Sequence, residues 1–240
     1  MPANWTHQAM PLPQEPSSAH LQLLAAFVKQ LKQDSGVSGV LLQGSVARGE
    51  HKTGSDLDLL VLLPPGDYRP FLSEVHDGIL VEVHQGSAAH LKERLTKRPS
   101  LAYGIRDGKI QFDRTGELDE LKLFATEILR DYSTPVQERE SIRYWLYTSQ
   151  IKLCAALDAD DDANAGLLAS TNTWKILEGL WAANDLPTPS GGSVLHYLKE
   201  LRLKPPQFQE SLIVLLTGTA KERAQVCSLI ISWLLEVRSI

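Results

Sequence analysis

Apolar residues are most densely grouped at residues 57–63, where a single aspartate interrupts the run LDLLVLL. A short apolar run that ends in turn residues, here Pro64 and Pro65, is typical of a buried strand. A second apolar stretch at residues 37–43 predicts another strand shortly before it. Together the two runs predict the centre of a small sheet.

A hairpin is predicted next along the chain. Residues 71–76 and 79–85 flank the dipeptide Asp77-Gly78, which is a strong signal for a two-residue turn between antiparallel strands. A last short strand is expected at residues 110–113.

Helical periodicity accounts for most of the remaining chain. In the first half it predicts helices at residues 17–34, 45–50, 87–97 and 118–130. After Pro135 no convincing strand follows, and helices are expected at residues 136–157, 163–184, 194–201, 206–216 and 220–237.

This change of pattern near residue 133 divides the chain. We expect a flexible tail at residues 1–16, because four prolines and several polar residues fall there. An α/β domain with a short mixed sheet is expected at residues 17–132, followed by an all-α helical bundle domain at residues 133–240.

Composition narrows the choice of class and location. The net charge of −5 argues against a broad basic surface for nucleic acid, and it weakly favours a cationic small substrate. No apolar stretch is long enough to span a membrane, and no signal-peptide pattern opens the chain, so we expect cytoplasmic residence. Cys154 and Cys227 lie in apolar segments that are predicted to be helical, so both thiols are expected to be buried.

The candidate chemistry begins with two aspartates at the start of the apolar strand. Asp56 and Asp58 are two positions apart, so a strand directs both carboxylates to one face. In the strand at 79–85, Glu82 lies on the face opposite to the apolar Val81 and Val83. If this strand pairs beside the first, Glu82 comes next to the two aspartates. The alternative is three unrelated charges at a turn, in solvent and at a sheet edge.

Three carboxylates at one point repel one another unless cations neutralise them. Ligation by oxygen alone, together with a phosphate substrate, indicates magnesium or manganese. Two such ions can activate an attacking hydroxyl and stabilise a leaving pyrophosphate.

A phosphate-binding turn is expected just upstream. Gly44 and Ser45 follow a predicted strand and open a short helix, where a glycine lets the backbone approach a phosphate and a serine hydroxyl can donate to it. A plain turn with a serine cap explains the same two residues, so this motif is weak by itself.

The three motifs together resemble the DNA polymerase beta-type nucleotidyltransferase superfamily. The resemblance is carried by Gly44-Ser45, the segment around Asp56 and Asp58, and Glu82, about a sixth of the chain. The two-domain layout is similar to that of small-molecule members such as the kanamycin, streptomycin and lincosamide nucleotidyltransferases. The resemblance implies that residues 17–132 form a nucleotidyltransferase domain and residues 133–240 a helical substrate-binding domain.

What the resemblance implies about function is specific. A nucleoside monophosphate, expected to be AMP from ATP, passes to a hydroxyl of a small molecule such as an aminoglycoside-like or lincosamide-like antibiotic, which would confer resistance. Asp56, Asp58 and Glu82 are implied as catalytic metal ligands for Mg²⁺, with two ions expected, and Gly44 and Ser45 as phosphate-binding residues. Lys175 is a further candidate for the triphosphate, although a solvated helix lysine explains it equally well.

Several alternatives stay open. The general base is not identified; Glu138 and Glu140 are candidates, but acidic residues also favour the first turn of any helix. The principal alternative function is an antitoxin-like module that nucleotidylates or binds a partner protein. A nucleic-acid polymerase is a poorer fit to the acidic charge. Related enzymes can complete their sites across a dimer, so a homodimer is also considered.

Overall fold

The computed structural model describes residues 16–237, which divide into two compact units: residues 16–130, called unit 1, and residues 131–237, called unit 2. Unit 1 combines a sheet with helices, and the described part of unit 2 is helical. The predicted fold class, an α/β domain followed by an all-α domain, is therefore confirmed. The tail predicted at 1–16 lies outside the described residues, apart from Pro16.

The sheet of unit 1 has five strands in the order β3-β4-β2-β1-β5. The strands are β1 (Gly39–Leu42), β2 (Leu57–Leu63), β3 (Leu72–His76), β4 (Ile79–Ser87) and β5 (Lys109–Asp113). Only the central pair β2 and β4 is parallel, and all other neighbours are antiparallel, so the sheet is mixed. The strand predicted at 57–63 has the observed limits, whereas the one predicted at 37–43 is shorter.

The predicted hairpin between β3 and β4 is confirmed. The two strands pair antiparallel on either side of Asp77 and Gly78, which have φ angles of 51° and 81°. Two successive positive φ angles are those expected for the two-residue hairpin turn that the Asp-Gly pair predicts.

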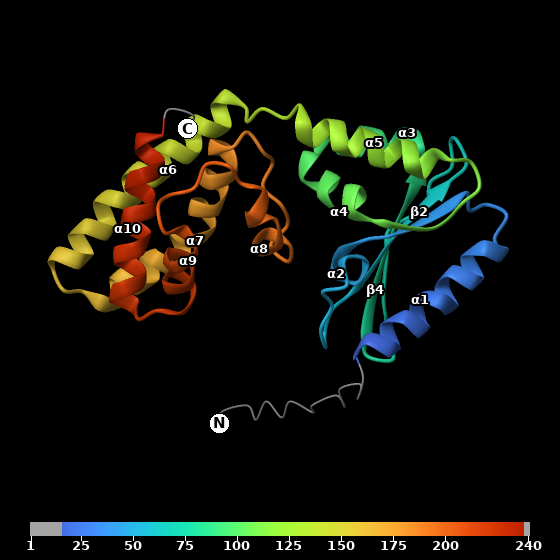
Figure 1. Cartoon of the computed structure of the whole chain (residues 1–240), viewed down its shortest axis with the longest axis horizontal. Coiled ribbons are helices and arrows are strands. Elements are labelled where there is room, and N and C mark those ends of the chain that lie inside the picture. Colours follow the sequence, from blue (N-terminus) through green and yellow to red (C-terminus); the bar gives the residue numbers. More distant parts are fainter. Residues whose placement is uncertain (1–15, 238–240) are drawn as a thin grey trace, which may run out of the picture. The chain divides into compact units, whose positions relative to one another are not determined.

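Helix α1 (Pro16–Gln33) covers one face of this sheet (Figure 1). Alternate residues of β2, beginning with Leu57 and Leu59, join it in an apolar cluster that also includes Val81 and Val83 of β4. Burial of each such side chain stabilises the fold by about 1.5–3 kcal/mol.

The opposite face carries Asp58 on β2 together with Glu82 and His84 on β4, and we call it the acidic face. Helices α3 (Ala88–Lys97) and α5 (Glu117–Arg130) lie along this side of the sheet with α4 (Ala102–Asp107) (Figure 1). They cover the part of the acidic face that follows Asp58 along β2, where Leu60 and Leu62 are buried.

The short 3-10 helix η1 (Pro99–Leu101) and α4 were not predicted. Their segment is too short to show a periodic stripe, but Ala102, Tyr103 and Ile105 are buried. Packing against the rest of unit 1 supports a helix this short, which sequence propensity alone would not.

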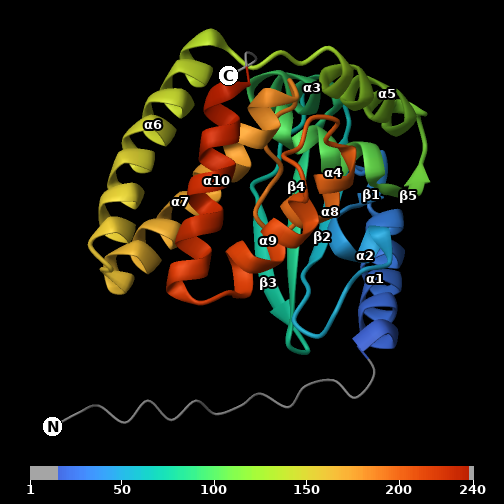
Figure 2. The same cartoon turned by 60° about the vertical axis from the view of Figure 1, so that its left-hand side comes forward.

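Unit 2 contains all the helices that were predicted for it. They are α6 (Val136–Asp158), α7 (Asp162–Ala183), α8 (Val194–Tyr197) with η2 (Leu198–Glu200), α9 (Phe208–Thr217) and α10 (Ala220–Glu236). Helices α6, α7 and α10 pack side by side (Figure 2). None of the described helices combines the length and apolarity needed to cross a membrane.

One expectation about burial in unit 2, that both cysteines are buried, is wrong for Cys154. Cys227 is buried, but Cys154 is exposed, because the buried stripe of α6 runs through Leu146, Ser149 and Leu153 and passes beside it. Among the tryptophans of this unit, Trp181 is fully buried, whereas Trp145 and Trp174 are 47% and 40% exposed.

Candidate active site

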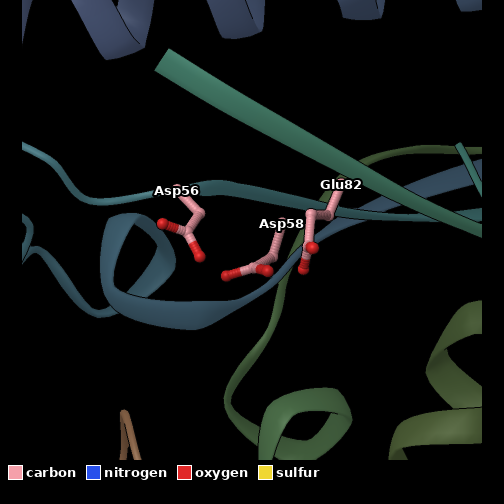
Figure 3. Close-up of side chains that lie close together, drawn as sticks. All are labelled: Asp56, Asp58 and Glu82. Carbon is pink, nitrogen blue, oxygen red and sulfur yellow. The ribbon is translucent and has the colours of Figure 1, made fainter. Parts of the chain in front are cut away.

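Three carboxylates meet at the start of the acidic face. Asp58 and Glu82 are direct partners in the parallel register of β2 and β4, and Asp56 immediately precedes β2. One carboxylate oxygen from each residue lies within 4.8 Å of those of the other two. Figure 3 shows all three side chains on the same side of the strands. The structure thus brings together the acids that the strand pattern predicted to converge.

The environment of Asp58 disfavours its charged form. Burial, followed by the charges of Asp56 and Glu82, raises its pKa to about 6, against a smaller opposing effect of Arg48. Arg48 itself forms an ion pair of 2.8 Å with Glu50. The acids therefore lack a full cationic partner within the described chain, and a divalent cation would fit this all-oxygen set.

Gly44 lies directly against the Asp58 carboxylate. It has a φ of +68°, and a Cβ atom built on it would lie 2.0 Å from Oδ2 of Asp58. The turn is held in place because the Gln43 amide donates a 2.8 Å hydrogen bond to the Asp58 carbonyl. Sequence analysis gave Gly44 a role toward phosphate but missed this contact, which depends on the pairing of β1 and β2 and has no local signal.

Ser45 is the second residue of α2 (Gly44–Arg48), a short helix anchored by the buried Val46 and Ala47. Its side chain is half-buried, and among residues 16–237 nothing hydrogen-bonds to its hydroxyl. That hydroxyl is available to a ligand at the edge of the acidic group. The assignment of Gly44 and Ser45 to phosphate stays a prediction.

His84 follows Glu82 on the same face of β4. Its ring centroid lies 4.7 Å from that of Phe71, and burial, followed by the charge of Arg94, lowers its pKa. His84 is therefore a neutral side chain at neutral pH and adds no positive charge beside the acids.

The other candidates belong to unit 2. Lys175 of α7 forms an ion pair of 2.6 Å with Glu178, and its ammonium lies 5.7 Å from the centre of the Trp145 ring. A role for Lys175 in binding the triphosphate stays a prediction. It would require Lys175 to leave its ion pair with Glu178. Glu138 and Glu140 are in the first two turns of α6. The pKa of Tyr132 is raised by burial and, to a smaller extent, by the charge of Glu138.

Comparison with known proteins identifies the superfamily. A family model described as "Nucleotidyltransferase domain" matches residues 24–145, which include every residue of the acidic group and the Gly44-Ser45 turn. No curated protein matches the chain. Among solved structures, a nucleotidyltransferase-like protein from Exiguobacterium sibiricum matches 92% of this chain and 74% of its own, with 14% identity and a TM-score of 0.41.

The contact between Gly44 and Asp58 gives a first prediction. Gly44→Ala should lower the free energy of unfolding by about 2–4 kcal/mol, because it adds a clash to the strain of a positive φ. It should also weaken Mg²⁺ binding, measured by calorimetry, because the Asp58 carboxylate must move. Gly49 is the matched control, since it has a φ of +75° with open space around it. Gly49→Ala should cost only about 1 kcal/mol and leave Mg²⁺ binding unchanged; equal losses in the two variants would refute the close approach.

The raised pKa of Asp58 gives a second prediction. Between about pH 4 and about pH 6 the folded chain retains a proton on Asp58 that the unfolded chain releases, so stability falls as the pH rises through this window. Asp58→Asn removes that loss. In metal-free buffer, its stability relative to the native chain should rise by on the order of 1–3 kcal/mol between about pH 4 and about pH 7.5.

Urea unfolding at the two pH values measures this change. Asp67→Asn is the control, because Asp67 is an exposed residue of the same unit and the substitution changes the charge equally. A relative stability of Asp58→Asn that does not vary with pH would show that the carboxylate is not electrostatically strained.

Proposed function

The chain belongs to the nucleotidyltransferase domain family, and from that membership we propose that it transfers a nucleoside monophosphate from a nucleoside triphosphate to a hydroxyl group of a small molecule. One observation carries this proposal. Asp56, Asp58 and Glu82 meet across the parallel pair β2 and β4, and the Gly44-Ser45 turn lies against them.

Under this proposal Asp56, Asp58 and Glu82 are the ligands of divalent cations, with Mg²⁺ and two ions as the expected occupancy. Bound there, the ions would supply positive charge that favours ionisation of the acceptor hydroxyl and stabilises the leaving pyrophosphate. The raised pKa of Asp58 supports this role, because burial and then repulsion by Asp56 and Glu82 disfavour its charged form, and a bound cation would offset both effects.

The residues of the chain would act mainly by positioning. The Ser45 hydroxyl and the backbone at Gly44 would hold phosphate oxygens at one side of the acids. The acceptor oxygen forms a bond to the α-phosphorus while the bond from that phosphorus to the bridging oxygen of the β-phosphate breaks. Pyrophosphate leaves, and the proton of the hydroxyl passes to solvent. Alignment of the two reactants is the principal contribution of such a site.

The finer assignments rest on the resemblance to small-molecule nucleotidyltransferases. We propose ATP as the donor, residues 17–132 as the catalytic domain and residues 133–240 as the domain that binds the acceptor. Lys175 is retained as a contact to the triphosphate, and the cytoplasm as the location, because nucleoside triphosphates are supplied there. An aminoglycoside-like or lincosamide-like antibiotic is the acceptor that the resemblance implies, and resistance would be its consequence.

Transfer can be tested with the purified chain, Mg²⁺, ATP labelled at the α-phosphate and a panel of hydroxylated acceptors. The native chain should release pyrophosphate and label an acceptor. Glu82→Gln should lower kcat by about a thousandfold or more, because it removes a charge from the group that stabilises the transition state. Chelation of Mg²⁺ should abolish the reaction of the native chain.

The control is Glu74→Gln, an exposed residue of β3 that undergoes the same chemical change. Its kcat should equal that of the native chain. Binding of ATP that does not depend on Mg²⁺, or full activity of Glu82→Gln, would rule out the proposed function.

A further inference from the structure

Unit 1 contains a basic cleft of about 380 Å³ beyond the acids. Nine residues line it, and they include four cations, Arg69, Arg94, Lys97 and Arg98, but no carboxylate. Its volume falls within the range of small-molecule sites. This local positive charge contrasts with the net charge of −5 of the whole chain.

The basic cleft opens on the acidic face. His84 lines it and follows Glu82 by two positions on β4, so the two side chains share a face about 6–7 Å apart along the strand. Helix α3, which supplies Arg94 and Lys97, packs on this same face: a Cβ atom at Gly86 would lie 2.8 Å from the His90 ring.

The strand order places the basic cleft on one side of the acids and the Gly44-Ser45 turn on the other. The turn follows β1, whereas the cleft is formed beside β4 and β3, and β2 with Asp58 lies between them. In nucleotidyl transfer the attacking oxygen and the leaving pyrophosphate lie in line on opposite sides of the α-phosphorus. With the leaving phosphates on Gly44 and Ser45, the acceptor enters from the side of the cleft.

The charges of the basic cleft are only partly neutralised. Arg69 pairs with Asp34 at 2.7 Å and Lys97 with Glu93 at 2.6 Å. Arg94 and Arg98 form no ion pair with any residue that the structure describes. A guanidinium binds the planar or tetrahedral oxygens of a carboxylate or phosphate through two parallel hydrogen bonds.

Aromatic rings complete the wall of the cleft. Phe71 lies against His84, and the Tyr68 ring centroid lies 5.6 Å from that of His90. Flat apolar faces beside fixed cations suit a compact ring that carries one anionic group.

We propose that the basic cleft binds an anionic group, a phosphate or a carboxylate, of the hydroxylated acceptor and so presents its hydroxyl to the acids. The inference rests on the proposed function, whose acceptor class it narrows, and it gives unit 1 a part in binding the acceptor in addition to residues 133–240. It also disfavours a polycationic aminoglycoside, because Arg94 and Arg98, whose charges no ion pair neutralises within the described residues, would repel it.

Four probes of one ring type separate the possibilities: glucose 6-phosphate, glucuronate, glucose and glucosamine. Each is titrated by calorimetry into the native chain saturated with Mg²⁺ and a non-hydrolysable ATP analogue, so that the donor site is already filled. The two anions should bind at least about tenfold more tightly than glucose, with glucosamine weakest. The tighter of the two anions identifies the phosphate or the carboxylate as the preferred group.

Arg94→Gln/Arg98→Gln should remove this preference while leaving the affinity for the Mg²⁺-bound ATP analogue unchanged. Lys29→Gln/Lys109→Gln is the control, because it changes the net charge equally at exposed positions of unit 1 outside the cleft. The control should retain the preference of the native chain for anions.

The inference is overturned if the native chain binds all four probes alike, or if the control loses the preference as well. It is also overturned if Arg94→Gln/Arg98→Gln weakens binding of the ATP analogue tenfold, since the cleft would then hold the donor's phosphates and the proposed function would stand. Failure of the native chain to bind the analogue with Mg²⁺ would instead refute the proposed function itself, and with it the role of the cleft.

Discussion

Parallel pairing of β2 with β4 holds Asp58 beside Glu82 although their charges repel, and the rest of the site depends on that pairing. The register extends from Leu57 opposite Val81 to Leu63 opposite Ser87, so the acids occupy only the beginning of a long ladder. Beneath them, the apolar side chains of both strands are buried with α1. Several buried residues at about 1.5–3 kcal/mol each outweigh the cost, on the order of 1–3 kcal/mol, of keeping the partly buried Asp58 charged beside two like charges. The paired strands therefore hold the three carboxylates together at an electrostatic cost, which a bound cation would lower.

The neighbouring elements turn this strained pair into an asymmetric site. On one side the antiparallel strand β1 leads into Gly44, whose missing side chain leaves room for the Asp58 carboxylate. On the other side the segment before β3, the end of β4, and α3 with Arg98 directly after it supply aromatic and cationic residues, and no acid, to the cleft wall. The two sides differ in chemistry because different strands border β2. A substrate with a phosphate tail and one with a single anionic group would accordingly be held in fixed relative order.

The sequence predicted those parts that local patterns encode. The apolar run ending at Leu63 and the alternation around Glu82 fixed the two strands, and their shared polar face followed from a period of two. Features that depend on contacts between residues far apart in the sequence could not be predicted from it. The approach of Gly44 to Asp58 requires the β1–β2 register, and α4 is stabilised by packing.

The sequence also did not predict which faces of the helices are buried. In α6 and α7 the helices are partly apolar all round, so the pattern did not show that Cys154 and Trp174 lie beside the buried stripe. Arg94 and Lys97 in the last turn of α3 and Arg98 directly after it bring three cations close together in the sequence, and this was the available signal for the basic cleft. Such spacing is equally common on helices that face solvent, and only the sheet beneath α3 distinguishes the two cases.

The position of β3 outside the parallel pair has a consequence for how the chain reaches its folded state. β3 and β4 can close first as a local hairpin, but β4 must then join β2 across the whole intervening segment. Non-local parallel pairing is a slow step in folding, because loop entropy is lost before contacts form. Glu82 joins the two aspartates only at this step, so the repulsion among the three carboxylates opposes the pairing that folding requires.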